Sequence, residues 1–548
     1  MAVNWTREQK QVIEGREKSL LVSAAAGSGK TAVLVERIIQ MITEGENPKD
    51  IDRLLVMTFT RAAAAEMRER IQAAIEKKLE SEPENEHLQQ QAVLVQFAQI
   101  TTIDSFCLHI MREHFDRLDI DPAFRVGDEG EMLLMRADVM DGLLEDYYRD
   151  GGKRYEEFVD AYATGKADDG IAEYVMQVYN FAQSNPWPDA WYEKCREELL
   201  LTEQGELEQT EWMQFLLRDI ALQAQEWKIQ LRETGGPMPY LPMIEEDLRH
   251  AEAVCGAAGS FETISEALEQ FTFSRLAAIR GKNGEVDPEK KALVSDCRSR
   301  VKKAVEKLKG EYLFASPEQM LADMEAGKER ILELLELAQE FGRRFRAKKK
   351  EKNVVDFHDL EHFALEILTE PEAECSEAEE TSSAEETDQM QGKNAWTVRV
   401  PGTVADELAV QYDEILVDEY QDSNLVQETL IQCISGERFD RPNVFMVGDV
   451  KQSIYKFRLA RPELFLEKYS TYTSEESAHQ KIELHQNFRS RDHILESINA
   501  IFYRIMTEKL GNISYTEDAA LHPGAAFEER DGLDELKTEL LLVDLSAQ

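Results

Sequence analysis

The segment that most constrains this chain is a short glycine-rich run at residues 24–31, which reads Ala-Ala-Ala-Gly-Ser-Gly-Lys-Thr. An apolar run at 20–22 (Leu-Leu-Val) precedes it, and residues 31–42 follow with the apolar spacing of an amphipathic helix. A buried strand, a glycine-rich turn and a helix in this order form the usual setting of a phosphate-binding loop. This setting predicts an α/β fold built on a parallel sheet.

The residue types in this run fit a phosphate ligand. Glycines 27 and 29 would let the backbone come close to the phosphates, so that backbone N–H groups face the anion. Lys30 is expected to pair with the β- and γ-phosphates of ATP, and Thr31 to hold Mg²⁺. The alternative is a glycine-rich turn without a ligand, because alanine replaces the first glycine of the generic pattern. The predicted nucleotide contacts are Ala24, Ala25, Ala26, Gly27, Ser28, Gly29, Lys30 and Thr31.

A pair of acids follows another apolar run, residues 415–417 (Ile-Leu-Val). Carboxylates at the carboxyl end of a parallel strand lie beside the nucleotide crevice of such a sheet. Asp418 is expected to bind Mg²⁺, directly or through water, and Glu419 to orient and deprotonate the attacking water. A charged, exposed strand end is the alternative for this pair alone, and the phosphate-binding loop favours the catalytic interpretation.

Strand and helix signals divide the chain into four expected segments. Alternating strands and helices in 1–115 and 351–475 indicate two parts of one sheet domain. Strand signals nearly vanish in 116–350, which predicts an inserted helical domain. Strands resume in 476–548, where we expect the start of a second domain that the chain leaves incomplete. Residues 370–394 are acidic, rich in Ser and Thr and poor in large apolar residues, which predicts a disordered surface loop.

The charge distribution limits the modes of nucleic-acid binding. A net charge of −44 argues against a protein that simply coats DNA, because such proteins are usually basic. A motor that holds one strand in a narrow channel needs basic groups only along that channel. A basic run at 343–350 has two interpretations: a contact with a phosphate backbone, or a solvated helix end, which we favour.

The cysteines and the apolar runs suggest a cytoplasmic protein without a membrane anchor. The six cysteines are scattered without a CxxC pair, which favours free thiols. No apolar run approaches the roughly 20 residues that a membrane helix needs. The first residues lack the basic start and apolar core of a signal peptide.

Further segments occur in the order found in superfamily 1 DNA helicases of the UvrD/Rep/PcrA type, and the chain resembles this family. The resemblance implies a RecA-like motor domain with a large helical insertion and the start of a second RecA-like domain. It also implies ATP and Mg²⁺ as cofactors, and single- and double-stranded DNA as partners. The matching segments are 6–9 (Q motif), 58–63 (motif Ia), 102–106 (motif Ib), 356–360 (DFxDL), 447–458 (motif III) and 486–490 (motif IV).

The resemblance assigns roles around the nucleotide. Gln9 would read the adenine edge, and Phe488 would stack on the adenine ring. Gln452 would sense the γ-phosphate, and Arg489 would reach the same phosphate from the second domain. For Arg489 a surface salt bridge is the alternative. The predicted catalytic residues are Lys30, Asp418, Glu419, Gln452 and Arg489.

The same resemblance implies contacts with a DNA strand. Stacking on aromatic side chains contributes about 1–3 kcal/mol per base and tolerates any base, which suits a motor. Arg61 stands where the family usually has Asn, and either contacts a phosphate or lies on the surface. Aromatic residues such as Phe59 and Phe457 have core packing as their alternative. The predicted DNA contacts are Phe59, Thr60, Arg61, Thr102, Asp104, Tyr455, Phe457 and Arg458.

Within the superfamily, the chain is most similar to AddA subunits of AddAB/RexAB helicase–nuclease complexes. The similarity rests on the Phe-Arg-Leu-Ala-Arg-Pro ending at 457–462, the Ala-Ala-Ala-Gly opening at 24–27 and the segment 487–491. It implies 3′→5′ movement, double-strand-break processing for homologous recombination and an AddB/RexB-type partner. The alternatives are a UvrD-like repair helicase without nuclease, or a module that only binds nucleotide or a partner. Since the second-domain motifs and the nuclease are not found, we expect a longer protein.

Overall fold

The structure of the chain is a computed structural model. It divides into two compact units. The sheet unit comprises residues 1–139, 179–188 and 342–548, and the helical unit comprises 140–178 and 189–341. The expected insertion, 116–350, is wider at both ends than the helical unit. The structure describes residues 5–45, 47–163, 169–200, 204–257, 259–278, 287–371, 399–456, 459–507 and 513–528.

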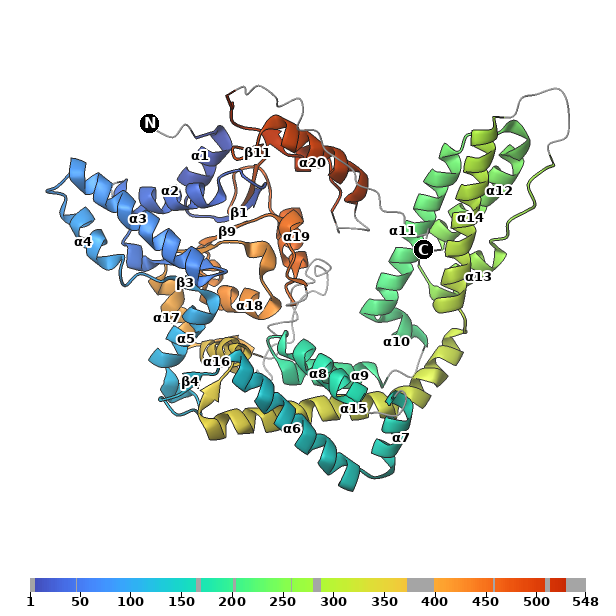
Figure 1. Cartoon of the computed structure of the whole chain (residues 1–548), viewed down its shortest axis with the longest axis horizontal. Helices are drawn as coiled ribbons and strands as arrows, with labels where there is room; N and C mark the ends of the chain where they lie inside the picture. Colours follow the sequence, from blue (N-terminus) through green and yellow to red (C-terminus); the bar gives the residue numbers. More distant parts are fainter. Residues whose placement is uncertain are drawn as a thin grey trace, which may run out of the picture. The chain divides into compact units, whose positions relative to one another are not determined.

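A parallel sheet of six described strands forms the centre of the sheet unit (Figure 1). The strand order is β10-β1-β9-β8-β2-β3, and every neighbouring pair is parallel. Parallel strands covered on both faces read as continuous apolar runs, which is why the sequence marks them clearly. The predicted α/β fold with a parallel sheet is therefore confirmed. The bounds are β1 (Ser19–Ala24), β2 (Leu54–Thr58), β3 (Ile100–Thr102), β8 (Glu414–Val417), β9 (Val444–Gly448) and β10 (His479–Leu484).

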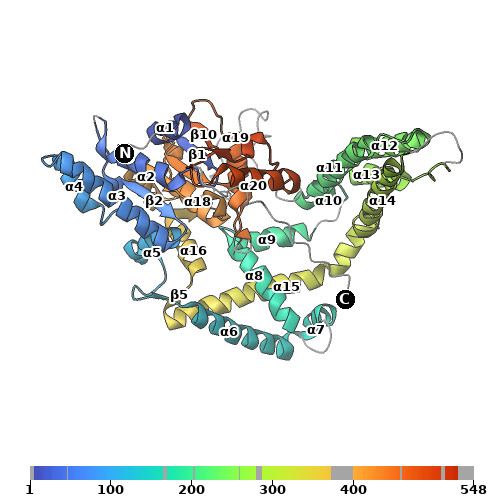
Figure 2. The same ribbon diagram turned by 45° about the horizontal axis from the view of Figure 1, so that its top comes forward.

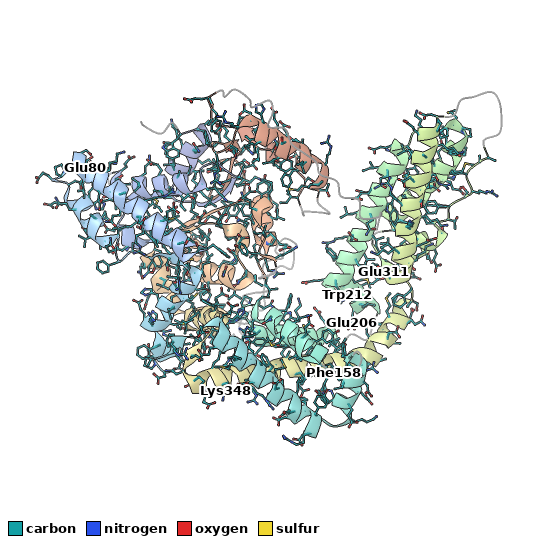
Figure 3. The ribbon with its side chains drawn as sticks, in the orientation of Figure 1. Glu80, Phe158, Glu206, Trp212, Glu311 and Lys348 are labelled. Atoms are coloured by element: carbon teal, nitrogen blue, oxygen red, sulfur yellow. The ribbon has the colours of Figure 1, made fainter. Side chains whose placement is uncertain are left out.

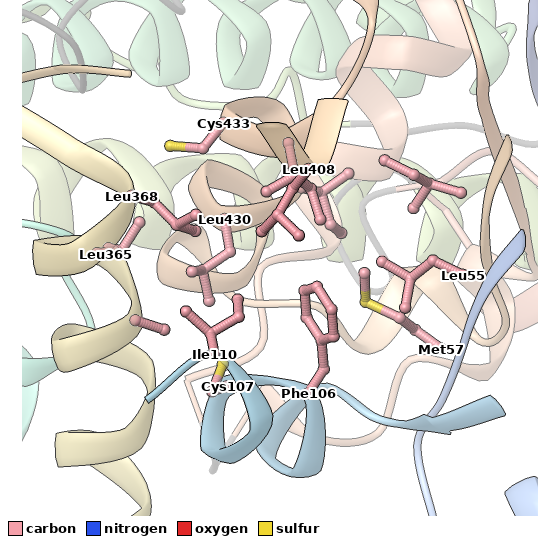
Figure 4. Packing of buried hydrophobic residues seen from close by; sticks show 14 of the residues in the cluster. Leu55, Met57, Phe106, Cys107, Ile110, Leu365, Leu368, Leu408, Leu430 and Cys433 are labelled. Carbon is pink, nitrogen blue, oxygen red and sulfur yellow. The ribbon is translucent and has the colours of Figure 1, made fainter. Parts of the chain in front are cut away.

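Successive side chains of the strands point to opposite faces of this sheet. Leu55 and Met57 pack against Phe106 and its neighbours on one face (Figure 4). Leu54 and Val56 belong to the apolar cluster on the other face. The first cluster includes residues of α5 (Ile103–Glu113), α16 (Phe357–Leu368), α17 (Thr403–Gln411), α18 (Leu425–Ile434) and α19 (Pro462–Thr471). The second includes residues of α1 (Arg7–Glu14), α2 (Lys30–Thr43), α3 (Arg61–Ser81) and α4 (Glu86–Leu94).

Strand β10 pairs with β1 in parallel register, with Val22 opposite Ile482. The expected start of a second domain at residue 476 precedes this strand, so a strand expected there belongs to the same sheet as the phosphate-binding loop. After β10 come β11 (Gln486–Asn487), α20 (Asp492–Ile505) and β12 (His522–Pro523), and β11 pairs in parallel with β12. Residues 372–394 of the expected acidic loop lie outside the described residues.

All described secondary structure of the helical unit is helix. Helices α11, α12, α13 and α14 lie side by side in Figures 1 and 2 and enclose one apolar core. Trp212 lies near the start of α11, and Glu311 is the last residue of α14 (Figure 3). The bounds are α6 (Glu129–Asp150), α7 (Gly152–Tyr162), α8 (Asp169–Gln183), α9 (Pro188–Glu198), α10 (Gln204–Gln209), α11 (Glu211–Glu233), α12 (Leu241–Gly256), α13 (Phe261–Gln270), α14 (Pro288–Glu311) and α15 (Pro317–Lys352).

The basic run at 343–350 ends in a buried ion-pair cluster, which neither interpretation of that run predicted. Lys349 is 3% exposed, and its Nζ lies 3.1 Å from Asp356 and 2.6 Å from Asp359. Burial would raise the pKa of Asp356, but Lys349 outweighs it and holds this pKa at about 2. The Asp356 side chain also caps α16. The solvated helix end is therefore wrong for Lys349, because its charge is neutralised inside the fold.

Two short strand pairs complete the sheet unit. Strands β4 (Arg125–Val126) and β5 (Val354–Val355) are parallel, and β6 (Thr369–Pro371) and β7 (Arg399–Pro401) are antiparallel. The five cysteines within the described ranges carry free thiols. No helix among the described residues combines the length and the apolar character that crossing a membrane requires.

Candidate nucleotide and DNA site

The phosphate-binding loop runs from the end of β1 to the first turn of α2. Gly27 and Gly29 have φ angles of 73° and 83°, in the left-handed region where a Cβ would be strained. Gly29 is the N-cap of α2, so Lys30 and Thr31 are the first two residues of this helix. The start of a helix offers unpaired N–H groups and the positive end of the helix dipole. This geometry suits an anionic phosphate group.

Asn487 fixes the loop from outside, and the sequence analysis gave this residue no role. Its Nδ2 donates to the carbonyl of Ala26 at 2.6 Å, and the backbone N–H of Phe488 donates to the carbonyl of Gly27 at 2.8 Å. A Cβ at Gly27 would lie 2.6 Å from Asn487 Nδ2. Gly27 is therefore required for its φ angle and for this close approach. The motif IV segment was the available signal, because Asn487 directly precedes Phe488 in it.

The two residues expected around the adenine line one cavity. Gln9, Ser28 and Phe488 contribute to an open cavity of about 580 Å³ beside the loop. The Gln9 Oε1 accepts from the Thr6 N–H at 3.0 Å, and its Nε2 donates to the Ser28 carbonyl at 3.0 Å. An amide side chain can make four hydrogen bonds, so Gln9 keeps one N–H and one lone pair for a ligand. The hydroxyl of Ser28 is buried without a hydrogen-bond partner among the described residues.

Lys30 and Glu419 face each other at the carboxyl edge of the sheet. The Lys30 Nζ lies 2.9 Å from Glu419 Oε2. Glu419 follows β8 and has φ of 51° and ψ of 44°, a left-handed conformation that costs a non-glycine residue about 1–3 kcal/mol. Such strained residues concentrate at functional sites. The structure therefore brings together the loop lysine and the expected catalytic base.

The acids beside Glu419 fit a divalent cation. Burial, followed by the charge of Glu419, raises the pKa of Asp418 to about 6 against the opposing effect of Lys30. The same two causes raise the pKa of Asp422 to about 6, and its Oδ1 is buried without a hydrogen-bond partner among the described residues. No described group of three or more His, Cys, Asp or Glu side chains could hold a metal alone. Mg²⁺ in nucleotide sites usually takes one or two carboxylates and completes its shell with phosphate and water.

The expected γ-phosphate sensors differ in how they are held. The Nε2 of Gln452 donates to Asp449 Oδ2 at 2.8 Å, just after β9. Arg489 is exposed, and only its backbone N–H is fixed, by Asn487 Oδ1 at 2.9 Å. No side chain of the described residues forms an ion pair with the Arg489 guanidinium, so the surface salt bridge that was its alternative is not seen.

Two of the expected DNA-facing aromatics contact each other. The rings of Phe59 and Tyr455 lie 4.7 Å apart between centroids, at 35° to each other. The core-packing alternative is wrong for Phe59, since the residue is 38% exposed. The pair joins the end of β2 to the segment after β9. Phe457 and Arg458 lie outside the described residues.

The remaining expected DNA contacts begin two helices. Thr60 is the N-cap of α3, where its side chain accepts from the Ala63 N–H, and Thr102 is the N-cap of α5. Arg61 is exposed at the first position of α3. Burial raises the pKa of Asp104, and the charge of Arg61 opposes this rise. The two hydroxyls therefore serve the local fold, and Arg61 remains open to solvent.

A buried glutamate behind this surface was missed by the sequence analysis. Glu361 of α16 is 5% exposed and accepts from Gln427 Nε2 at 2.7 Å and from Asn424 Nδ2 at 3.5 Å. Burial, followed by the charge of Asp104, raises the pKa of Glu361 to about 7. An acid within the apolar spacing of an amphipathic helix was the only available signal.

Comparison with known proteins identifies the family. The UvrD/REP helicase N-terminal domain matches residues 5–473. A relative from Lachnoclostridium phytofermentans, described as an ATP-dependent helicase/nuclease subunit, is 44% identical over 100% of this chain and 39% of the relative. Relatives of the same description from Clostridium beijerinckii (41% identical; 96% of this chain, 41% of the relative) and Bacillus licheniformis (40%; 98% and 42%) are also similar. The chain thus spans about two fifths of the length of these relatives. The domain match confirms the resemblance drawn from the motifs: the chain belongs to the UvrD/REP helicase family.

Proposed function

We propose that the chain is the ATP-hydrolysing part of a motor that moves along single-stranded DNA. The observation that carries this proposal is the contact between Lys30 and Glu419, because it joins a phosphate-binding lysine to a carboxylate at the carboxyl edge of a parallel sheet. The membership in the UvrD/REP helicase family supports it. The activity belongs to a helicase–nuclease that processes double-strand breaks for homologous recombination, with 3′→5′ movement.

In this function the site binds ATP with Mg²⁺. Lys30 holds the β- and γ-phosphates, and the cavity with Gln9 and Phe488 takes the adenine. Asp418 and Thr31 are the residues that would hold Mg²⁺, which neutralises charge on the phosphates when bound. Glu419 orients the attacking water and accepts its proton. Gln452 and Arg489 complete the contacts with the γ-phosphate.

The DNA strand is proposed to run over the surface that presents Phe59 and Tyr455. Both aromatic residues flank segments that leave the carboxyl edge of the sheet, next to the nucleotide site. A change at the γ-phosphate therefore has a short path to the bases. Arg61, Thr60, Thr102, Asp104, Phe457 and Arg458 are the further proposed contacts.

The proposed partner is a second subunit of the AddB/RexB type. The similar relatives are described as subunits of a helicase/nuclease, which supports a heteromeric assembly. We place the complex in the cytoplasm, where its DNA substrate lies.

An ATPase assay tests the proposal. The purified protein, with any subunit that co-purifies, should hydrolyse ATP faster when single-stranded DNA is added. Lys30→Ala and Glu419→Gln should each abolish this stimulated hydrolysis. Lys49→Ala is the matched control, because Lys49 is half-exposed and pairs with Asp413 at 3.1 Å, before β8. Unchanged hydrolysis in the first two variants would refute the motor function and leave a module that only binds nucleotide or a partner.

A further inference from the structure

We propose that Gln421 is a positioning residue that links the catalytic base Glu419 to the phosphate sensor Gln452; this inference rests on the proposed function. Gln421 lies in the 3₁₀ turn Tyr420–Asp422 that follows β8, and it is 2% exposed. The amide is therefore shielded from water, and its hydrogen bonds are made within the protein.

The Gln421 amide is oriented by three neighbours. Its Nε2 donates to Glu419 Oε2 at 2.9 Å and to Asp422 Oδ2 at 3.2 Å. Its Oε1 accepts from the backbone N–H of Asp449 at 2.9 Å. A flipped amide would place its oxygen against two carboxylates and its NH₂ group against an N–H donor. One orientation is therefore fixed, and both N–H donors of the amide are used.

Asp449 continues the path to the sensor. Its Oδ2 accepts from Gln452 Nε2 at 2.8 Å, and its Oδ1 lies 2.9 Å from Lys451 Nζ. Asp449 is 1% exposed, so hydrogen bonds are what keep its carboxylate in place. Together with the amide of Gln421, these bonds form a continuous path from Glu419 to Gln452.

Gly448 leaves room for this path. A Cβ at Gly448 would overlap Gln421 Oε1 and would also approach the backbone N of Gln421 at 3.2 Å. The φ angle of Gly448 is not in the positive region, so its backbone conformation does not require glycine. The close approach of the Gln421 amide is what requires it. The sequence on both strands thus favours the bridge.

The bridge matters most when ATP arrives. Lys30 and Gln421 both donate to the same oxygen of Glu419. Once the phosphates engage Lys30, Gln421 remains as the donor that orients this carboxylate. The same amide is tied to Asp449, whose position follows Gln452. Gln421 thereby makes the orientation of the base depend on the contact of the sensor with the γ-phosphate.

The first test separates catalysis from binding. Gln421→Leu should lower kcat for DNA-stimulated ATP hydrolysis at least tenfold and change the Kd for ADP less than threefold. Gln432→Leu is the matched control, because Gln432 also donates to a buried glutamate, Glu428, at 2.8 Å outside the site. Equal kcat for Gln421→Leu and the control would overturn the inference.

An isosteric variant guards against a folding defect. Gln421→Glu keeps the shape and places a third carboxylate beside Glu419 and Asp422, which raises their pKa values. The acidic limb of the kcat–pH profile should therefore move to higher pH. A merely structural role would leave this limb in place.

The second test is a pair of substitution cycles. Gly448→Ala should lower kcat in the original chain and have less than a twofold effect in a Gln421→Ala background, where the overlapping amide is gone. Gln421→Leu and Gln452→Leu should together cost no more than the larger single loss. Multiplying losses in both cycles would overturn the bridge. Loss of hydrolysis in Lys30→Ala with normal hydrolysis in Gln421→Leu would sink this inference alone, whereas retained hydrolysis in Lys30→Ala would sink the proposed function.

Discussion

The Lys30 ammonium lies 2.9 Å from the Glu419 carboxylate, although the two residues are separated by most of the chain. Their strands are not neighbours in the sheet, because β9 lies between β1 and β8. The contact is made above the carboxyl ends of the strands, in the space that phosphates are expected to enter. Incoming nucleotide therefore has to replace a carboxylate as the partner of Lys30.

This competition predicts opposite effects of two substitutions on nucleotide binding. Glu419→Gln removes the competing charge, so the Kd for a non-hydrolysable ATP analogue should stay unchanged or fall. Lys30→Ala removes the phosphate partner and should raise this Kd at least tenfold, which corresponds to about 1.4 kcal/mol. Titration with a fluorescent analogue measures both values. Equal weakening in the two variants would contradict the competition.

The raised pKa of Asp418, about 6, predicts how Mg²⁺–nucleotide binding depends on pH. A metal ligand has to be ionised, so the affinity for ADP with Mg²⁺ should fall by up to about tenfold per pH unit below pH 6. Asp418→Asn should be weaker throughout and show a flatter pH dependence. Titrations between pH 5 and 8, with and without Mg²⁺, measure the effect. An equal pH dependence without Mg²⁺ would assign the titration to another group.

The loop and the carboxylate pair could be predicted because each depends on residues that are neighbours in the chain. The buried runs at 20–22 and 415–417 are continuous and apolar, and Lys30 and Asp418 follow them at short, defined distances. The alternation of strands and helices then predicts a parallel sheet. The catalytic and DNA-contact roles of individual residues stay predictions, since the structure gives their positions and not their activity.

The missed features depend on neighbours in space. Nothing local distinguishes Gln421 from any polar residue beside two acids, because its bridge requires that β8 lie next to β9. Lys349 reads as one more residue of a basic run until Asp356 and Asp359 are brought against it. Strand β10 was recognised as a strand, but its place beside β1 depends on a connection that the apolar pattern does not specify.

Glu361 predicts a pH-dependent stability of the sheet unit. Its pKa of about 7 lies above the ordinary value of 4.5, so the folded chain binds a proton that the unfolded chain has lost. Stability is then retained below pH 4.5 and falls as the pH rises through 7, by about 1.4 kcal/mol per pH unit.

Glu361→Gln should remove this dependence. The amide stays neutral, so the variant should be more stable than the original chain at pH 8, and equal or less stable at pH 5, where one hydrogen-bond acceptor is lost. Thermal unfolding at both pH values measures the difference. Glu366→Gln, an exposed position on the same helix, is the matched control. A lower unfolding temperature for Glu361→Gln at pH 8 would contradict the expected sign.

The Phe59–Tyr455 pair predicts how the protein holds a DNA strand. Phe59→Ala and Tyr455→Ala should each weaken binding of a single-stranded oligonucleotide about tenfold, since stacking contributes about 1–3 kcal/mol per base. The Kd for ADP should stay within twofold, because neither ring lines the cavity with Gln9 and Phe488. Fluorescence anisotropy measures the DNA affinity.

The control and the cycle make this prediction specific. Phe97→Ala removes another exposed phenylalanine, 75% exposed and located before β3, and should leave DNA affinity unchanged. The two rings are in contact, so the double variant should lose less than the product of the single losses. Full multiplication would mean that the rings bind DNA independently, and an unchanged affinity in both single variants would remove this surface from the proposed DNA path.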